Sequence, residues 1–519
     1  MTQQYDIAII GSGFAGSLLA MIARRLGHSV VLIERGKHPR VVIGESSTPL
    51  TNLLLEDLTT RYDLPAIRPL AKWGTWQKAY PEVGCGLKRG FTFYHHSLEK
   101  PEPFPPGRDR QLLVAASPHN EISDTHWYRA DFDYLFVQEA QKLDVHYLDE
   151  TTLTGIIESH DMIELSGTRN DRPIAISAKF LVDASGPRGF LHHALGLQET
   201  ELPRFPSTQA LYSHFTGVGR MQPAPSGGQK DLEPYPPDSA AVHHVFDGGW
   251  IWVLQFNNGI TSAGIAATDA AAARWNLHEG AAAWDRILED IPALRTQFAN
   301  AKPVQPFRHV PRLSFRSATI AGQRWALLPS AAGFVDPLLS TGFPLALLGV
   351  DRLANIIEHH WGSPAFAMRL ESYSREVDAD LLATTQLIGA LYASLNNFPV
   401  FASLTLLYFA AVSFAETARR LGKPELAPSF LLRDHPRFGP SSASLFERAR
   451  YIHTQEEARQ LSEDILRAIE PFNIAGLGYP QRHNWYPVEA QDLIDNAAKL
   501  DANPQEIHQL LRRCGFHPQ

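Results

Sequence analysis

The segment from residue 6 to residue 34 constrains the fold more strongly than any other part of the chain. The apolar run Asp6–Ile10 leads into Gly11-Ser12-Gly13-Phe14-Ala15-Gly16, and a helical stretch, Ser17–Leu26, follows. Gly27-His28 then turns the chain into a second apolar run, Ser29–Ile33, which ends at Glu34. This order predicts a strand–turn–helix–strand unit of about thirty residues.

Each glycine of this turn has a role in binding a dinucleotide. Gly11 permits a tight turn, Gly13 lets the backbone approach a pyrophosphate, and Gly16 lets the helix pack closely on the sheet. The N-terminus of the helix faces the anion, and Glu34 suits a ribose hydroxyl. Because the chain carries a single such fingerprint, we expect a tightly held FAD, with hydride arriving from elsewhere.

Later segments are expected to complete this sheet and to add a second one. Phe180–Pro187 is a strand running into an Asp-small-small-Gly turn, and the strand Trp325–Leu328 leads into Ser330–Pro337. Gly90–His95 and Val242–Phe256 are rich in aromatic and β-branched residues, which is typical of strands. Loops rich in proline and glycine are expected at 101–107 and 223–237.

From Leu345 onward the pattern is helical. The predicted fold is therefore an α/β, FAD-binding Rossmann-type domain, like that of glutathione reductase and the class A flavoprotein monooxygenases. An interleaved substrate-side sheet and a helical C-terminal region are expected to complete it. We place the FAD-binding module with its interleaved sheet at 1–350 and the helical region, which covers the active site, at 351–519. The predicted helices are Leu345–His360, Pro364–Ala383, Leu387–Leu395, Val400–Leu421, Thr454–Ile469 and Pro487–Leu500.

Composition excludes several classes of protein. Of the 519 residues, 44% are hydrophobic and 20% charged, which excludes a largely disordered chain. The net charge of −8 and the lack of a Lys/Arg run argue against nucleic-acid binding. The two cysteines form no metal or disulfide pattern, and the start shows no secretory signal, so we expect a cytoplasmic protein.

One uncharged segment, Leu381–Ala415, raises the question of membrane contact. Gln386, Asn396 and Asn397 interrupt it, and Pro399 breaks its periodicity. We therefore favour a buried helical pair, or a hydrophobic surface over the active site, over contact with a membrane.

Four stretches resemble the flavin-dependent halogenases. The first is the fingerprint with Glu34, followed by Arg40–Pro49, and the second is Gly86–Phe91, where the family has its essential lysine. The third, Gly248–Leu254, is similar to the family's WxWxIP motif, and the fourth, Phe334–Gly342, satisfies FxxPxxSxG. The residue sequences of these motifs look closest to those of the pyrrolnitrin-type branch, which chlorinates a free aminophenylpyrrole.

The chain departs from the family pattern at two positions. The WxWxIP motif ends here in Leu254-Gln255, so its proline is lost. Ser330 stands where most class A flavoenzymes have an aspartate that binds the ribityl chain, a change shared with the pyrrolnitrin type. Neither departure removes the lysine or the halide motif.

The resemblance implies a reaction scheme and its site residues. Reduced FAD and O2 give a flavin hydroperoxide, halide attacks it, and the resulting hypohalous acid reaches Lys88 and then an aromatic carbon. Ser340, Thr341 and Gly342 form a turn suited to a halide, since backbone N–H groups can hold a bare anion. Lys88 has to be close to neutral or a strong donor, and burial among Leu87, Phe91 and Phe93 favours the neutral amine.

On a strand, Lys88 and its neighbour Arg89 point to opposite faces, whereas Trp250 and Trp252 point to the same face. The two tryptophans are expected to form a wall between flavin and substrate or a packed aromatic core. Leu339 stands where tryptophan halogenases carry a glutamate, which argues against free tryptophan and for an electron-rich ring. Four adjacent histidine pairs lack metal-binding spacing, so no metal site is expected. Predicted substrate contacts are Phe93, His95, Trp250, Trp252 and Leu339. Predicted FAD contacts are Gly11, Ser12, Gly13, Phe14, Ala15, Gly16, Glu34, Arg35, Arg40, Ser46, Arg129, Asp183, Ser330, Pro337, Thr341 and Gly342.

The sequence thus predicts an enzyme of secondary metabolism that uses FADH2 from a separate NAD(P)H flavin reductase, O2, and chloride or bromide. Its substrate is expected to be an electron-rich aromatic or heteroaromatic small molecule of the pyrrole or phenol type. Two alternatives remain open. One is a single-component FAD aromatic monooxygenase, and the other, favoured by Gln255 and Ser330, is a flavin-binding protein without halogenation activity.

Overall fold

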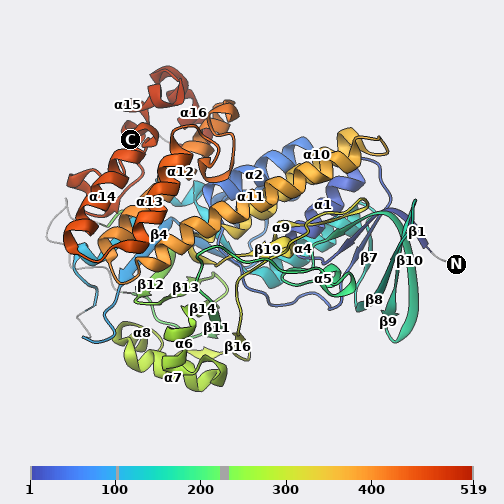
Figure 1. Cartoon of the computed structure of the whole chain (residues 1–519), viewed down its shortest axis with the longest axis horizontal. Helices are drawn as coiled ribbons and strands as arrows, with labels where there is room; N and C mark the ends of the chain where they lie inside the picture. Colours follow the sequence, from blue (N-terminus) through green and yellow to red (C-terminus); the bar gives the residue numbers. More distant parts are fainter. Residues whose placement is uncertain (1–2, 101–103, 222–232, 517–519) are drawn as a thin grey trace.

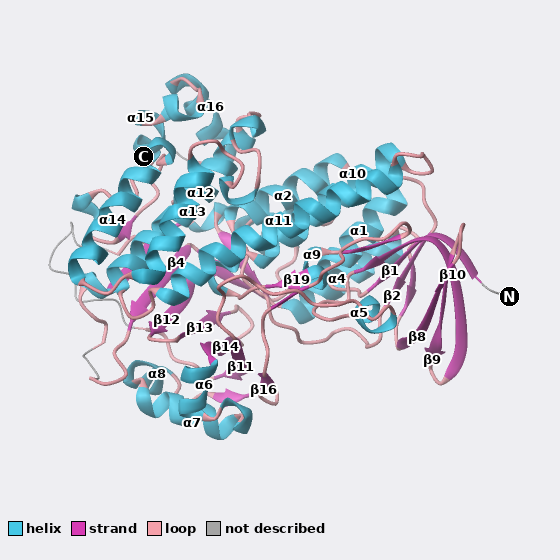
Figure 2. Cartoon of the chain, in the orientation of Figure 1, coloured by secondary structure: helices cyan, strands magenta, loops and turns pink. Residues whose placement is uncertain are grey.

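The computed structural model describes residues 3–100, 104–221 and 233–516. In Figure 1 one group of strands lies at the right and a second at the lower left, with the long helices α10, α11 and α12 above them. Figure 2 shows the same layering, with most helices above the sheets and the short helices of residues 269–297 below the second sheet. The loops predicted at 101–107 and 223–237 lie partly outside the described residues.

The first sheet has seven strands within the described part of the chain, in the order β7-β2-β1-β10-β9-β8, with β18 beside β10. Strands β2, β10 and β18 run parallel to their neighbours β1 and β10, as the strand–turn–helix–strand pattern predicted. The sheet therefore unites segments far apart in sequence, and its dinucleotide turn lies at the carboxyl ends of parallel strands. Its strands are β1 Gln3–Ile10, β2 Val30–Ile33, β7 His146–Leu148, β8 Thr151–Glu158, β9 Ile163–Arg169, β10 Arg172–Asp183 and β18 Trp325–Leu327.

A second, nine-stranded sheet is interleaved with the first, as predicted, in the order β15-β11-β14-β13-β12-β4-β5-β20 with β16 beside β11 in the described residues. A separate pair, β3 (Cys85–Lys88) and β6 (Asp124–Trp127), carries Lys88. Strands β17 (Phe315–Arg316) and β19 (Gly333–Phe334) form another pair. The nine strands are β4 Gly90–His95, β5 Gln111–Ala115, β11 Thr208–Thr216, β12 Ala241–Phe246, β13 Gly249–Gln255, β14 Thr261–Thr268, β15 Lys302–Pro303, β16 Arg308–Val310 and β20 Trp485–Tyr486.

Helices α1 (Phe14–Arg25), α4 (Arg129–Lys142) and α10 (Gly342–His360) lie close to the first sheet. Helix α11 (Phe366–Ala393) is a single helix of 28 residues, so the prediction of two helices over this region was wrong. Thr384 and Thr385 donate to the carbonyls of Asp380 and Leu381, at 2.8 and 2.7 Å. Because these hydroxyls are satisfied within the helix, polar residues do not end it.

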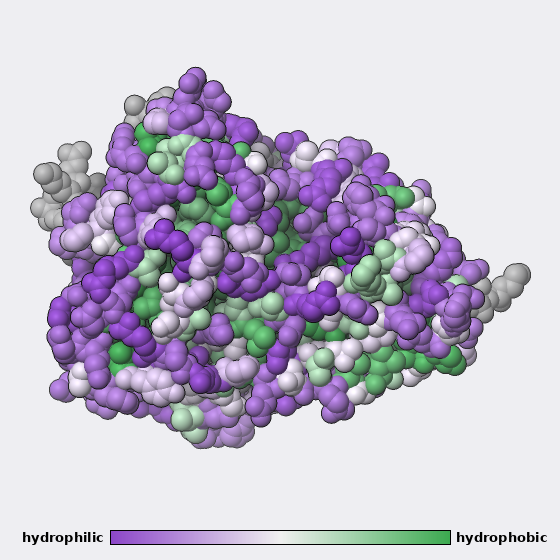
Figure 3. All heavy atoms as spheres, turned by 45° about the horizontal axis from the view of Figure 1, so that its top comes forward, coloured by the Kyte–Doolittle hydropathy of each residue, from purple (hydrophilic) through white to green (hydrophobic). Residues whose placement is uncertain are grey.

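Helix α12 (Phe398–Arg420) begins rather than breaks at Pro399, which occupies its first turn. Proline suits that position because the first N–H groups of a helix have no partner within it. Among the described residues α12 is the one helix long and apolar enough to span a membrane, and 83% of its most apolar window is buried inside the protein. This agrees with the predicted buried helical pair. Figure 3 shows polar side chains over most of one face, with apolar ones mainly in its hollows.

The remaining helices pack in different places: α5 and α9 contact strands of the first sheet, α6 contacts the second sheet, and α2 packs against α10 and α12. The C-terminal ones include α13 and α16, which the sequence pattern did not reveal. Strand β20 comes from the C-terminal region yet pairs with β5, so that region contributes to the interleaved sheet. The division of the chain at residue 350 stays a prediction. These helices are α2 Pro49–Arg61, α3 Trp73–Ala79, α5 Phe190–Ala194, α6 Asp269–Trp275, α7 Ala281–Asp290, α8 Pro292–Gln297, α9 Pro329–Ala332, α13 Phe438–Arg448, α14 Gln455–Ile469, α15 Ala490–Asp495 and α16 Pro504–Cys514.

Candidate active site

A cavity of about 1040 Å³ extends from the glycine turn to the two motif tryptophans. The turn after β1, the motif that precedes α10 and residues 40–46 all line this cavity. Phe14 of the turn packs against Phe343 at the start of α10, with ring centroids 5.1 Å apart. The predicted cofactor residues that line it are Gly11, Gly13, Phe14, Ala15, Gly16, Glu34, Arg35, Arg40, Ser46, Arg129, Ser330, Pro337, Thr341 and Gly342.

The glycine turn is as tight as its sequence predicted. Gly11 has a φ of +98°, and a Cβ atom added there would lie 2.5 Å from the carbonyl oxygen of Ala184. A Cβ on Gly16 would lie 2.1 Å from the carbonyl oxygen of Gly11. Backbone therefore packs on backbone at this point, which leaves the N-terminus of α1 open toward the cavity.

Glu34 is held as an anion beside this turn. Its Oε2 accepts from the backbone N–H of Ser12 at 3.2 Å and from the Ser12 hydroxyl at 2.9 Å. Arg40 donates to the same oxygen at 3.2 Å, and the N–H of Gly36 donates to Oε1 at 3.0 Å. Burial raises the pKa of Glu34, but Arg40 and these donors outweigh it and lower the pKa overall.

Arg129 ties three segments together at the cavity wall. Its guanidinium makes two bonds to Asp133, of 2.7 and 2.8 Å, and donates to the Gly44 carbonyl at 2.9 Å. Asp133 also accepts from the N–H of Phe14 at 3.2 Å. Arg129 thus connects α4 both to the start of α1 and to residues 40–46.

The predicted halide turn, Ser340-Thr341-Gly342, also lines the cavity. Its unusual backbone angles fall on Leu339 and Ser340, with φ of 63° and 56°, and not on Gly342. Helix α10 starts at Gly342, and a Cβ added there meets nothing within 4 Å. Gly342 is therefore not required by its backbone angles, and a larger side chain there has room.

A buried carboxylate, Asp336, holds this turn against two other elements. Its Oδ1 accepts from the N–H of Leu338 at 2.9 Å and from Trp250 Nε1 at 3.1 Å. Its Oδ2 accepts from the Tyr392 hydroxyl of α11 at 2.8 Å. Burial raises the pKa of Asp336 to about 7, against the effect of these donors.

Lys88 is fully buried on β3, in register with Asp124 of β6. Its Nζ donates to the Ser47 carbonyl and lies 3.7 Å from the centroid of the Phe91 ring. Burial lowers the pKa of Lys88 to about 7, although the charge of Asp124 acts in the opposite direction. Ser46 lines the cavity and Ser47 bonds to Lys88, so the lysine lies directly behind the wall.

The predicted directions of the strand side chains are confirmed. Arg89 donates to the carbonyls of Ser117 and Pro118, away from the buried Lys88. Trp250 and Trp252 both line the cavity, with ring centroids 5.7 Å apart.

Several predicted contacts lie away from the cavity. Ser12 is turned toward Glu34, and Asp183 accepts from the N–H groups of Ser185 and Leu191 at 2.9 and 2.7 Å. The prediction that Asp183 contacts the cofactor is therefore not supported, because its carboxylate stabilises its own turn. Phe93 and Leu339 are also fully buried outside the cavity lining.

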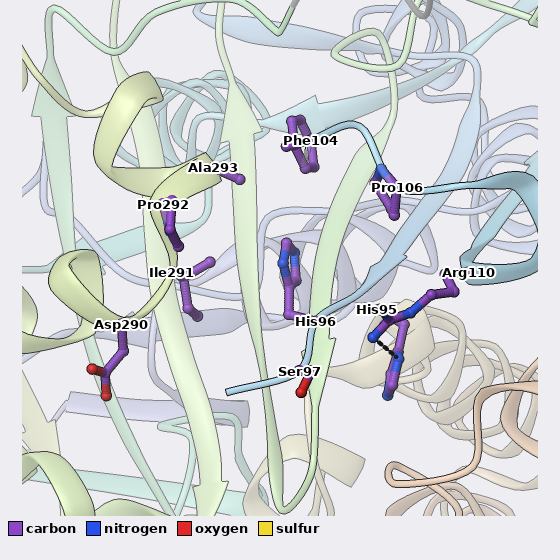
Figure 4. Close-up of a pocket in the computed structure, with 10 residues that line it drawn as sticks. All are labelled: His95, His96, Ser97, Phe104, Pro106, Arg110, Asp290, Ile291, Pro292 and Ala293. Atoms are coloured by element: carbon purple, nitrogen blue, oxygen red, sulfur yellow. Dashed lines mark hydrogen bonds between the residues drawn. The ribbon is translucent and has the colours of Figure 1, made fainter. Parts of the chain in front are cut away.

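His95 lines a different, small pocket of about 20 Å³ between β4 and α8. Figure 4 shows it beside Arg110, whose Nη2 lies 3.2 Å from His95 Nδ1. His95 Nε2 also contacts the Leu395 carbonyl at 3.2 Å. The structure therefore does not bring His95 together with Lys88 or the tryptophans.

In the described residues, no group of three or more His, Cys, Asp or Glu side chains could hold a metal ion.

The comparisons with known proteins agree with this architecture. A family model described as "Tryptophan halogenase" matches residues 124–397, and one described as "NAD(P)-binding Rossmann-like domain" matches residues 9–49. The chain belongs to the tryptophan halogenase family.

Among curated relatives, monodechloroaminopyrrolnitrin halogenase PrnC of Pseudomonas fluorescens is 28% identical over 360 residues, or 68% of this chain and 61% of PrnC. The match thus spans less than two thirds of PrnC. Tetracycline 7-halogenase of Kitasatospora aureofaciens is 27% identical over 78% of this chain and 73% of its own. The solved structure of halogenase PltM in complex with phloroglucinol and FAD has a TM-score of 0.77 and 24% identity, covering 89% of this chain and 96% of its own. The predicted resemblance to flavin-dependent halogenases, including the pyrrolnitrin type, is confirmed.

Sequence reasoning missed four residues at the site. Asp124 and Asp336 are described above, and Glu45 lines the cavity while accepting from His214 Nε2 of β11 at 2.8 Å. The His214–Glu45 pair is almost fully buried and fixes residues 40–46 to the second sheet. For Glu45 and Asp336 a signal existed, because each carboxylate stands inside a motif that carries other site residues.

Proposed function

We propose that this protein is an FADH2-dependent halogenase that acts on an electron-rich aromatic or heteroaromatic small molecule. One observation carries the proposal. A single cavity is lined by the dinucleotide turn, the halide motif and the tryptophan pair, and a desolvated lysine lies directly behind its wall.

The residues present fit FAD. The open N-terminus of α1 suits a pyrophosphate, the carboxylate of Glu34 suits a ribose, and Arg40 and Arg129 add positive charge at the same wall. Ser330 offers a neutral hydroxyl where other flavoenzymes offer a carboxylate. When bound and reduced, FAD would supply, with O2, the oxidising power that turns a halide ion into hypohalous acid.

The chain's own residues then have separate tasks. The turn at Ser340–Gly342 holds a halide through the backbone N–H groups of Thr341 and Gly342, because the first N–H groups of a helix lack partners within it. The Ser340 N–H donates to the Pro337 carbonyl at 3.1 Å. Asp336 fixes this turn to Trp250, so the halide site and the tryptophan wall keep one geometry. Trp250 and Trp252 close the cavity on the side of the second sheet.

Lys88 receives the hypohalous acid and passes its halogen to the substrate. A fully charged surface lysine is a poor nucleophile, whereas an amine whose pKa is about 7 has a substantial neutral fraction near neutral pH. The substrate side is the aromatic region beyond Lys88, where Phe93 stacks on His243 at 4.5 Å and meets Phe401 of α12 at 5.7 Å.

The names of the relatives support an electron-rich ring. PrnC is named for an aminopyrrolnitrin, two other relatives for a pyrrole-2-carbonyl carrier protein, and PltM was solved with phloroglucinol. We infer a pyrrole or phenol type of substrate, and a separate NAD(P)H-dependent reductase that supplies FADH2, because the sequence has one dinucleotide fingerprint.

The test is a panel of an arylpyrrole, a phenol and an indole, each incubated with FADH2, O2 and chloride or bromide. Mass spectrometry should find a halogen isotope doublet in at least one product. A hydroxylated product in its place, together with rapid flavin reduction by NADPH without a reductase, would assign a monooxygenase. Flavin reoxidation without any modified product would assign a flavin-binding protein.

A further inference from the structure

One imidazole of the second sheet belongs both to the cofactor cavity and to the surroundings of the buried lysine. His243, on β12, lines the cavity together with the glycine turn and the two tryptophans. Its ring stacks on Phe91 and Phe93, with centroids 5.9 and 4.5 Å apart. Lys88 Nζ lies 3.7 Å from the centroid of the same Phe91 ring. His243 and Lys88 therefore share an aromatic neighbour, the first on the cavity side and the second behind the wall.

The contacts of this ring fix which nitrogen carries its proton. Burial lowers the pKa of His243 to about 3, and the charge of Lys88 acts in the same direction, so the ring is neutral and has one N–H group. Nδ1 lies 3.2 Å from the Thr92 carbonyl, which can only accept, and the Ala241 carbonyl beside the ring is an acceptor as well. The proton is therefore assigned to Nδ1, and Nε2 keeps a lone pair.

This lone pair has no donor within the protein. Among the described residues no N–H or O–H group donates to His243 Nε2, and the nitrogen is not sealed in, unlike the unpartnered ring nitrogens of His126 and His244. Because His243 lines the cavity, Nε2 opens onto it. The rings of Phe93 and Trp250 flank it, with centroids 4.5 and 5.2 Å away. The wall thus presents one unused acceptor within an apolar, aromatic surface.

A neutral acceptor of this kind selects a small donor without charge. Halide ions and flavin phosphates are anions, which a nitrogen lone pair repels. Hypohalous acid is small and neutral, carries an O–H group, and has to travel from this cavity to Lys88. We propose that His243 Nε2 accepts the O–H of hypohalous acid and holds the molecule at the cavity wall until it reaches Lys88. This inference rests on the proposed function.

The contact changes no covalent bond. The hydrogen of the acid faces Nε2, so the halogen end stays free to react with the lysine amine. Without the acceptor, the acid has no polar partner on this aromatic surface and returns to the open cavity and to solvent. The expected benefit of His243 is therefore yield, measured as halogenated product for each flavin reoxidised, and not the rate of the flavin chemistry.

The experiment compares His243→Gln, His243→Asn and His243→Phe with wild type. The amide of glutamine reaches the position of Nε2, that of asparagine reaches the position of Nδ1, and phenylalanine keeps a ring without nitrogen. Each protein receives FADH2, O2, halide and an arylpyrrole or phenol, together with a soluble 1,3-diketone that captures hypohalous acid escaping into solution. Halogenated product and halogenated diketone are then counted for each flavin reoxidised.

We expect His243→Phe and His243→Asn to lower the product yield roughly tenfold, which is the worth of one hydrogen bond. The missing halogen should appear on the diketone, while flavin reoxidation and the KM of the aromatic substrate stay unchanged. His243→Gln should restore most of the yield. His244→Phe is the matched control, because it removes the next buried imidazole of β12, on the opposite face of the strand, and should behave as wild type.

A second readout needs no flavin. Nitrogen-15 NMR of the flavin-free protein, with the His243 signal assigned by its absence from the variants, should show a neutral ring protonated on Nδ1. A ring protonated on Nε2, or a charged ring at neutral pH, would exclude an acceptor at the cavity and overturn the inference.

Three other outcomes would also overturn it. One is a wild-type yield in His243→Phe. Another is rescue by His243→Asn and not by His243→Gln, which would leave His243 only a structural bond to Thr92. The third is a raised KM without halogenated diketone, which would assign Nε2 to a donor on the substrate. If His243→Phe fails to fold, the comparison of glutamine with asparagine decides. A wild-type protein that halogenates neither substrate nor diketone would refute the proposed function itself, which is a different result from a normal halogenase whose yield ignores His243.

Discussion

Replacing Lys88 by methionine tests the desolvated lysine without measuring activity. Methionine fills a similar volume and carries no charge, so it removes the buried amine and keeps the packing against Phe91. The pKa of Lys88 falls from 10.5 to about 7 because the side chain is fully buried. An unfolded lysine keeps its proton up to about 10.5, so between these values the unfolded chain binds more protons than the native one.

The sign and size of the effect follow. The contribution of Lys88 to wild-type stability must rise with pH across this window, by about 1.4 kcal/mol for each pH unit, which amounts to about 5 kcal/mol in total. Lys88→Met lacks this contribution. Asp124 changes the stability difference between wild type and variant in the same direction. Without the charge of Lys88 the raised pKa of Asp124 rises further, so the variant loses stability in alkali.

Urea unfolding of wild type and Lys88→Met at several pH values between 6.5 and 10 measures this difference. The free energy of unfolding of wild type relative to the variant should increase steadily with pH. Lys78→Met is the control, because that side chain is 75% exposed and pairs with Glu121 at the surface. A difference that stays flat with pH would mean that Lys88 is solvated, and would remove the physical basis for its role.

Three further predictions concern the cavity. Gly16→Ala should lose bound flavin on desalting, because its Cβ would lie 2.1 Å from the Gly11 carbonyl oxygen. A wild-type flavin content in this variant would contradict the role of the glycine turn in holding FAD. Gly342→Ala, with open space around its Cβ, is the control. Gly342→Val should keep its circular dichroism and melting curve but lose halide-dependent turnover, since the added side chain enters the cavity; normal halide saturation would remove this turn from the mechanism. Burial lowers the pKa of His214, but Glu45 outweighs this effect and raises the pKa overall. The stabilisation from this pair is therefore complete below pH 6.5 and is lost as the pH rises through the higher pKa of His214 in the native state. The melting temperature of wild type relative to Glu45→Gln should fall across that window, and a constant difference would refute the coupling.

The sequence predicted the parts of the site that depend on local backbone geometry. Gly11, Gly16 and Glu34 belong to one strand–turn–helix–strand unit, whose function requires residues at fixed spacing. The cavity position of Trp250 and Trp252 follows from the two-residue period of a strand. Local rules also placed Lys88 and Arg89 on opposite faces.

The parts that could not be predicted depend on how distant segments meet. Asp124 joins the site because β6 pairs with β3 in one register, and Asn52, 72 residues away in sequence, holds it there. Asp336 meets Tyr392, 56 residues away, only because α11 is continuous through Thr384 and Thr385. Asp183 lies outside the cavity lining for the opposite reason, since its carboxylate accepts from Ser185 and Leu191 in the segment that follows it.

The most direct test of the account measures halogenated product and flavin reoxidation together, in wild type and Lys88→Met. Both proteins receive the same FADH2, O2, halide and arylpyrrole or phenol. The account predicts that flavin reoxidation is nearly equal in the two proteins, and that the halogen isotope doublet is present in wild type and absent from Lys88→Met. Halogenated product formed by Lys88→Met at the wild-type rate would contradict the central claim that the buried lysine carries the halogen to the substrate.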